Sequence, residues 1–145
     1  MTRRGTILST LFAVVLLAVP SIARAQSHAE AVWAQLNRTY TQVNGDGFGS
    51  RNYIIGRMAN GVSDSWTLTL PGGSAYKIVG VCDNDCEDLD IRVTIGDDLV
   101  AEDVLDDDVP IVNFTAKGEQ RYNVKVTMAT CKADPCFWGI GIFYK

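Results

Sequence analysis

Residues 88–95 read Asp-Leu-Asp-Ile-Arg-Val-Thr-Ile, so polar and apolar side chains alternate strictly along this stretch. Successive side chains of a β-strand point to opposite faces of the sheet, and the alternation therefore predicts a strand with one buried and one solvated face. Residues 121–128 repeat the pattern. Their apolar members are Tyr122, Val124, Val126 and Met128. Two such strands predict an antiparallel sheet that covers a core on one side.

Similar segments lie on both sides of these two strands. From about residue 52 the apolar residues tend to recur at every second position, and Trp66, Leu68 and Leu70 alternate with threonines. Other apolar segments lie at 76–82, 111–114 and 138–144, with turns rich in Gly, Pro and Asp between them. About seven short strands at this spacing are typical of an antiparallel β-sandwich. The residues therefore predict a mainly β fold.

Residues 29–44 have helical rather than strand periodicity. The apolar residues whose spacing places them on one helix face are Trp33, Leu36, Tyr40 and Val43. The glycine-rich stretch 44–50 then ends the helix. An amphipathic helix must bury its apolar face, and we expect this one to pack on the sandwich or cover a sheet edge rather than bind a partner.

Residues 1–25 have the layout of an export signal. Arg3 and Arg4 precede an apolar run that ends at Val19, and Ala23-Arg24-Ala25 places small residues where a signal peptidase reads. The apolar run is shorter than the roughly 20 residues that a membrane-spanning helix needs. We expect cleavage after Ala25, a periplasmic or secreted protein, and no membrane span in the mature form. The predicted parts are a signal peptide (1–25), a helix with its glycine-rich loop (26–50) and a β-sandwich domain (51–145).

Cleavage makes the chain more acidic. The signal carries three of the 13 basic residues and none of the 17 acidic ones, so the remaining 120 residues hold 10 basic and 17 acidic groups, a net charge of −7. Such a charge argues against nucleic acid or an anionic membrane surface as partner. A chain of this length suits one domain with one core.

The four cysteines all follow the signal. They are Cys82, Cys86, Cys131 and Cys136. An even number in a small exported domain predicts two disulfides. Three connectivities exist, and we favour the local pairs, Cys82 with Cys86 and Cys131 with Cys136, because each pair spans a turn-like segment. A four-thiolate zinc site is the alternative that an oxidising compartment disfavours.

Acidic residues concentrate in one segment. Residues 83–108 hold 12 of the 17 acids and a single base, Arg92. Asp88 and Asp90 share a face of their predicted strand. Calcium takes oxygen ligands from carboxylates and loop carbonyls, which this segment could supply. We favour a solvated face that keeps the domain soluble. The alternative is a calcium site, the one cofactor indicated, built from Asp83, Asp85, Asp88 and Asp90.

No catalytic residues are predicted. His28 is the single histidine and lies three residues into the predicted mature chain, where a side chain is expected to be mobile. Histidine-based triads therefore lack a well-placed base, and oxidised cysteines cannot act as nucleophiles. A hydrolase that uses two carboxylates is the remaining enzymatic alternative, but so short a chain leaves little room for a deep cleft.

The last strand carries alternating aromatic and glycine residues. Phe137, Gly139, Gly141 and Phe143 share one of its faces. The glycines could leave a shallow sugar-binding groove or could let a neighbouring element approach closely, and we favour close approach. Trp66 and Trp138 lie on faces that we expect to be buried.

Three segments resemble the bacterial pre-peptidase C-terminal (PPC) domain family. They are Tyr76-Lys77-Ile78-Val79-Gly80-Val81-Cys82-Asp83, Asp88-Leu89-Asp90-Ile91-Arg92-Val93 and Arg121-Tyr122-Asn123-Val124-Lys125-Val126. The resemblance covers roughly residues 64–145 and implies a jelly-roll-like β-sandwich, with relatives that include collagen-binding modules with calcium sites. On this resemblance, Asp88 and Asp90 match the family's paired aspartates. The chain departs from the family's usual setting because no peptidase precedes the domain and the cysteine pairs are not general to the family.

Two functions remain from the sequence. One is a secreted or periplasmic, non-catalytic binding or accessory module that recognises a protein or polysaccharide surface. Its binding could depend on calcium. The other is a structural or stress-related envelope protein with no specific ligand. The sequence alone leaves both open.

Overall fold

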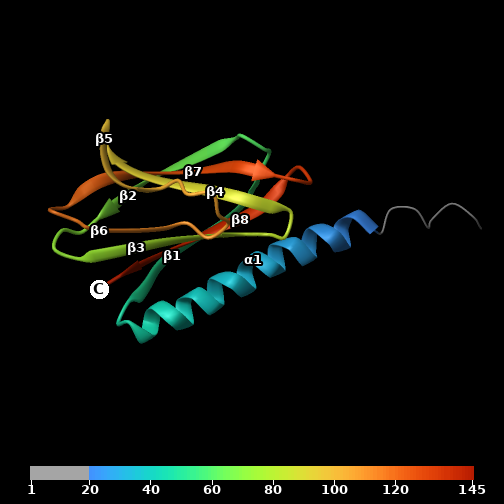
Figure 1. The fold of residues 1–145 in the computed structure, drawn as a ribbon. Helices are drawn as coiled ribbons and strands as arrows, with labels where there is room; N and C mark the ends of the chain where they lie inside the picture. The colour runs from blue at the N-terminus through green and yellow to red at the C-terminus, as the bar shows by residue number, and fades with distance from the viewer. Residues whose placement is uncertain (1–19) are drawn as a thin grey trace, which may run out of the picture.

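The structure is a computed structural model that describes residues 20–145, in which the chain forms one helix and eight strands (Figure 1). Most of the predicted export signal lies outside the described residues. The helix α1 spans Pro20–Gly45. The strands are β1 (Gly49–Met58), β2 (Ser63–Leu70), β3 (Ala75–Cys82), β4 (Cys86–Ile95), β5 (Asp98–Asp103), β6 (Ile111–Thr115), β7 (Gln120–Cys131) and β8 (Cys136–Tyr144). The predicted mainly β fold with one N-terminal helix is confirmed.

The strands form two four-stranded antiparallel sheets packed face to face. One sheet has the order β1-β8-β3-β6 and the other has the order β2-β7-β4-β5. Apart from the hairpin β4–β5, successive strands of the chain alternate between the sheets, which is the strand order of a jelly roll. The sequence missed β5, because its residues do not alternate in polarity and it pairs only with β4, at the edge of its sheet.

The core fills the space between the sheets. Leu89, Ile91 and Val93 of β4 are fully buried, as the alternation predicts. From the opposite sheet, Trp138 is also fully buried, and its ring lies 5.1 Å from that of Trp66.

The helix packs on the outer face of the β1-β8-β3-β6 sheet (Figure 1), so packing on the sandwich is confirmed. Its buried stripe is Val32, Leu36 and Val43, whereas Trp33 and Tyr40 are 47% and 37% exposed. The predicted helix face was therefore wrong at two of its four positions. The stripe that includes Val32 lies directly over β8, where smaller side chains let the helix come close.

The glycines of β8 make this close approach possible. A Cβ atom on Gly139 would lie 2.8 Å from Val32 Cγ1 and 3.0 Å from Leu36 Cδ1. The prediction that a neighbouring element approaches these glycines is thus confirmed for Gly139. Phe143, on the same face, is fully buried.

Both local disulfides are present, Cys82–Cys86 and Cys131–Cys136. Cys86 and Cys131 also face each other in the β4–β7 ladder, so the two bridges lie at the same end of the sandwich. No helix within residues 20–145 is long and apolar enough to cross a membrane.

Candidate functional site

The turn between β3 and β4 is short and held by the Cys82–Cys86 disulfide. Asp83, the first residue of this turn, is only 3% exposed. Its Oδ1 accepts a hydrogen bond from the Asp85 amide at 3.3 Å, and its Oδ2 accepts one from the Phe137 amide at 3.0 Å. The Asp83 amide in turn donates to the Phe137 carbonyl at 2.9 Å. The buried carboxylate is therefore fixed by backbone donors from two segments.

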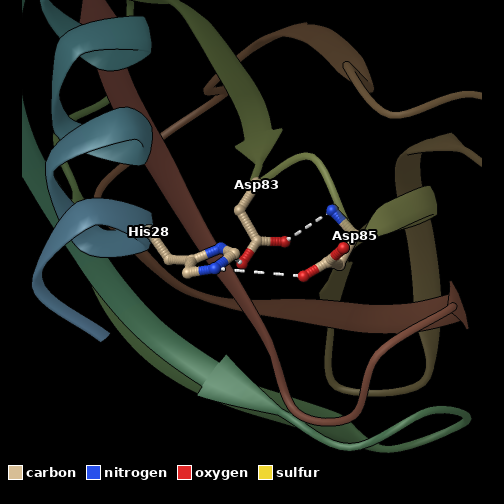
Figure 2. Close-up of side chains that lie close together, drawn as sticks. All are labelled: His28, Asp83 and Asp85. Carbon is tan, nitrogen blue, oxygen red and sulfur yellow. Dashed lines mark hydrogen bonds and ion pairs between the residues drawn. The ribbon is translucent and has the colours of Figure 1, made fainter. Parts of the chain in front are cut away.

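His28 completes a cluster with the two aspartates of this turn. Its Nδ1 lies 2.9 Å from Asp83 Oδ2 and its Nε2 lies 3.9 Å from Asp85 Oδ2 (Figure 2). The ring also stacks on Phe137, with 6.0 Å between ring centroids. His28 lies within α1, which begins before the predicted cleavage site, and its side chain is 28% exposed. Its mobility in the cleaved chain stays a prediction.

A second polar contact ties the helix to the same turn. Gln35, two helical turns after His28, donates from Nε2 to the Cys82 carbonyl at 2.7 Å. Below it, Val32, Leu36 and Val81 form a small apolar cluster with Phe137 packed against it. His28 therefore sits where α1, the β3–β4 turn and the start of β8 meet.

This cluster has the composition of a metal site. Among the described residues, His28, Asp83 and Asp85 are the group in which one potential ligand atom from each side chain lies within 4.8 Å of the others. Imidazole and carboxylate together suit zinc and its transition-metal neighbours, whereas calcium takes oxygen ligands. A histidine that binds a metal usually donates its other N–H to a carboxylate, and Asp83 is placed to accept it.

Asp88 and Asp90 lie outside this cluster. They are on β4, where Leu89 and Ile91 point into the core, so both aspartates belong to the outer face of the other sheet. The structure thus divides the four aspartates that the sequence grouped: Asp83 and Asp85 join His28, and Asp88 and Asp90 do not.

The environment of Asp88 and Asp90 disfavours their charged forms. Partial burial, followed by the nearby charges of Asp90, Asp106 and Asp107, raises the pKa of Asp88. Partial burial also raises the pKa of Asp90, against the lowering effect of Arg92. In addition, Asp88 Oδ1 is buried and has no hydrogen-bond partner among the described residues. An unpaired carboxylate oxygen among like charges is a favourable place for a cation.

The chain matches no family model and no curated protein. Its resemblance to the PPC family therefore stays a prediction. The candidate metal site is therefore inferred from the positions of its own residues.

Proposed function

We propose that this chain is an exported, non-catalytic binding module that holds a divalent transition-metal ion between His28 and Asp85, with Asp83 orienting the imidazole. The observation that carries the proposal is the single histidine, whose two ring nitrogens face two carboxylates of a disulfide-closed turn. One of these carboxylates is almost wholly buried.

The proposed site uses the two ring nitrogens differently. Nδ1–H donates to Asp83 and fixes the ring, while Nε2 offers its lone pair to the metal beside Asp85. Tetrahedral metal–nitrogen and metal–oxygen bonds of about 2.0–2.2 Å place two ligand atoms about 3.3–3.6 Å apart. Nε2 and Asp85 Oδ2 are 3.9 Å apart, so a small rotation of the partly exposed Asp85 side chain would bring them to that distance.

Two protein ligands leave coordination positions open. The side chains of His28 and Asp85 are 28% and 40% exposed, so a further donor can reach the ion from solvent. A carboxylate or imidazole of a partner protein could fill such a position, which would make partner binding depend on the metal. The net negative charge of the mature chain supports this role because it raises the local concentration of cations.

Calorimetric titration of the EDTA-treated mature chain with Zn²⁺ tests the proposal. We expect binding that His28→Gln and Asp85→Asn each weaken by about 10-fold or more. Asp64→Asn, on an exposed position of β2, serves as the matched control and should leave the affinity unchanged. Equal affinity in all four proteins would exclude the site.

Calcium at Asp88 and Asp90 is a second candidate, favoured by the buried, unpaired Asp88 Oδ1. Titration with Ca²⁺ should then give heat that Asp88→Asn removes and His28→Gln retains. Absence of heat at millimolar Ca²⁺, with an unchanged melting temperature, would leave this segment as a solvated acidic face.

A pull-down from envelope extract separates a binding module from a structural protein. The binding proposal expects a defined partner that is captured with Zn²⁺ and released by EDTA, and expects its loss in Asp85→Asn. Capture of no specific partner, either with or without metal, would favour a structural envelope role. The resemblance to PPC modules, whose relatives include collagen-binding domains, supports a binding role but not the choice of zinc as the ion.

A further inference from the structure

The edge of the sandwich where β5 and β6 meet exposes a group of apolar side chains. β5 and β6 are edge strands of the two sheets, and the Asp103 carboxylate of β5 accepts a hydrogen bond from the Ile111 amide of β6 at 2.8 Å. Half of the large apolar side chains that are exposed within residues 20–145 lie on this edge. They are Leu99, Val104, Leu105, Val109 and Ile111, with exposed fractions from 39% to 68%. We call residues 97–115 the β5–β6 surface.

The backbone that carries these side chains is hydrogen-bonded to both sheets. The Asp107 carbonyl accepts a hydrogen bond from the Leu89 amide of β4 at 3.0 Å, and the Pro110 carbonyl accepts one from the Gly80 amide of β3 at 2.8 Å. The Asp107 carboxylate accepts a further bond from the Val109 amide at 2.9 Å. The connection between β5 and β6 therefore presents its apolar side chains on a fixed backbone. Exposed apolar patches with a polar rim are typical of interaction surfaces.

The charges around these apolar side chains are all negative. Residues 93–116 hold seven acids and no base. Glu102 forms an ion pair with Arg92, on the neighbouring strand. Asp103 and Asp107 accept hydrogen bonds from backbone amides. The other four acids are exposed and form no ion pair with another residue of the described part of the chain: Asp97, Asp98, Asp106 and Asp108. Positive groups of a partner would therefore meet unpaired negative charges on this surface.

A groove at one end of the surface offers space for an apolar side chain of a partner. Its volume is about 550 Å³. The Phe114 ring lies 5.5 Å from the ring of Tyr76 and 5.3 Å from that of Tyr122, so packing of aromatic rings fixes the floor of the groove. The apolar lining consists of Ile95, Leu99, Val100, Phe114 and Tyr122.

We propose that the β5–β6 surface binds an extended segment of a partner protein that carries both basic and apolar side chains. The six residues of β5 span about 20 Å, a length that about six residues of an extended chain match. The apolar side chains of the segment pack on the exposed apolar residues, while its long lysine and arginine side chains reach the carboxylates around them. The inference goes beyond the proposed metal site and does not depend on it.

Charge complementarity favours a basic partner over a second copy of this chain. Contact between two copies of the β5–β6 surface would bring two acidic edges together, and like charges across an interface oppose association. Nucleic acid and anionic membranes are disfavoured for the same reason.

A designed peptide tests the inference. The probe is a fluorescently labelled peptide of seven residues, in which lysine alternates with valine and both ends are blocked. Anisotropy measures its affinity for the purified protein in EDTA. NaCl at about 0.15 M shortens the screening length to about 8 Å, which weakens long-range attraction by the net charge. One control peptide has serine in place of valine, and the other has glutamate in place of lysine.

We expect the lysine–valine peptide to bind at least about 10-fold more tightly than either control peptide, because only this peptide satisfies both the apolar and the charged parts of the surface. Leu105→Ser should weaken its binding by about 5-fold or more. Val62→Ser, at an exposed apolar residue between β1 and β2, is the matched control and should leave the affinity unchanged. Both side chains are exposed, so neither change is expected to disturb the fold, and matching thermal melts check this.

A second pair of variants tests the carboxylates. Asp106→Asn combined with Asp108→Asn should weaken binding of the lysine–valine peptide by about 5-fold, since each exposed ion pair contributes up to about 1 kcal/mol. Glu30→Gln combined with Asp64→Asn removes the same charge from exposed positions on α1 and β2, and should have little effect.

Several outcomes would overturn the inference. No binding of the lysine–valine peptide, or equal binding of the serine peptide, would mean that the apolar side chains are not used. Equal losses in the test variants and in their matched controls would mean that the peptide binds elsewhere. A wild-type dimer that Leu105→Ser converts to a monomer in sedimentation would mean that the surface pairs two copies. His28→Gln should bind the peptide as tightly as the wild type, so failure of the zinc site and failure of this surface are distinguishable.

Discussion

Gly139 is the residue on which the docking of the helix depends most directly. Alanine at this position would place a Cβ 2.8 Å from Val32, 3.0 Å from Leu36 and 3.2 Å from the Ile54 carbonyl oxygen. The carbonyl belongs to the sheet backbone and cannot move aside, so the helix must shift. We expect Gly139→Ala to lower the free energy of unfolding by about 1–3 kcal/mol, measured by urea denaturation.

Gly45→Ala is the matched control for this change. A Cβ there meets no atom within 4 Å, and the substitution adds the same methyl group. It should leave the urea midpoint nearly unchanged. A Gly139→Ala midpoint equal to that of the control would show that the helix is not held against β8.

Asp88 makes folding sensitive to pH in a direction opposite to that of most aspartates. Its pKa is raised in the folded state from an ordinary value of 3.8, first by burial and then by Asp90, Asp106 and Asp107. The folded state therefore keeps the proton more tightly than the unfolded state. The stabilising contribution of Asp88 is complete below its pKa in the unfolded state. It is lost as the pH rises through the higher pKa of Asp88 in the folded state.

We accordingly expect Asp88→Asn to raise the melting temperature at pH 7 by a few degrees and to change it little near pH 3. Thermal melts of the two proteins across this range measure the difference. Asp64→Asn, on an exposed position of β2, is the control for loss of one charge. A wild-type protein that is more stable than Asp88→Asn at pH 7 would mean that the Asp88 charge has a partner, such as a bound cation.

How much of the site the sequence could reveal depends on the distance along the chain. Asp83 and Asp85 lie together in a turn whose closing cysteines are visible in the sequence, and both were candidates. His28 could not be added, because it is 55 residues away from Asp83 and reaches it only when the helix docks on the sheet. Its position next to a predicted cleavage site also argued for mobility, because a local pattern does not show how the helix packs on the sheet.

At the scale of the element, the helix packs on the sheet through a narrow stripe of buried side chains. Leu36 is fully buried, whereas Trp33, on the predicted face, is 47% exposed and touches Tyr53 edge-on. We expect Leu36→Ala to lower the free energy of unfolding by about 2–5 kcal/mol, because it leaves a cavity between helix and sheet. Trp33→Ala removes the larger side chain but should cost less, and urea denaturation of both variants measures the contrast.

If Trp33→Ala lowered the free energy of unfolding more than Leu36→Ala, the helix face predicted from periodicity would be the one that packs on the sheet. Helical periodicity itself explains why the predicted face of the helix was wrong at two positions. Leu36 and Val43 fit two neighbouring stripes, one completed by Trp33 and Tyr40 and the other by Val32. Choosing between them needs the opposing surface, and the glycine at 139 accepts the smaller valine.

At the scale of the whole molecule, the strands could be predicted but their neighbours could not. The alternation in 88–95 and 121–128 marked two strands, and the structure places them side by side as β4 and β7. Nothing in either stretch indicates that β8 lies between β1 and β3. Pairings between distant segments depend on how both sheets close around one core, which a local pattern does not record.

The charge of the mature chain sets a last property of the whole molecule. With a net charge of −7 after the predicted cleavage and most acids in one segment, repulsion is stronger in the compact state than in the expanded unfolded state. Raising NaCl from about 0.01 to 0.15 M shortens the screening length from about 30 to 8 Å. We therefore expect the melting temperature of the mature protein to rise by a few degrees over this range, measured by thermal melts at pH 7.

Salt also weakens ion pairs, which lowers the melting temperature. The sign of the measured change therefore shows whether repulsion or ion pairing is the larger effect. Arg92 bonds Glu102 at 2.7 Å and Lys132 pairs with Glu87, and salt weakens both. Exposed pairs of this kind contribute about 0–1 kcal/mol each, less than the summed repulsion of a dozen clustered acids should cost. The double variant Asp88→Asn, Asp90→Asn should show a smaller rise with salt because it removes two of those charges. A melting temperature that falls with salt in the wild-type protein would mean that the pairs, and not the repulsion, dominate its electrostatics.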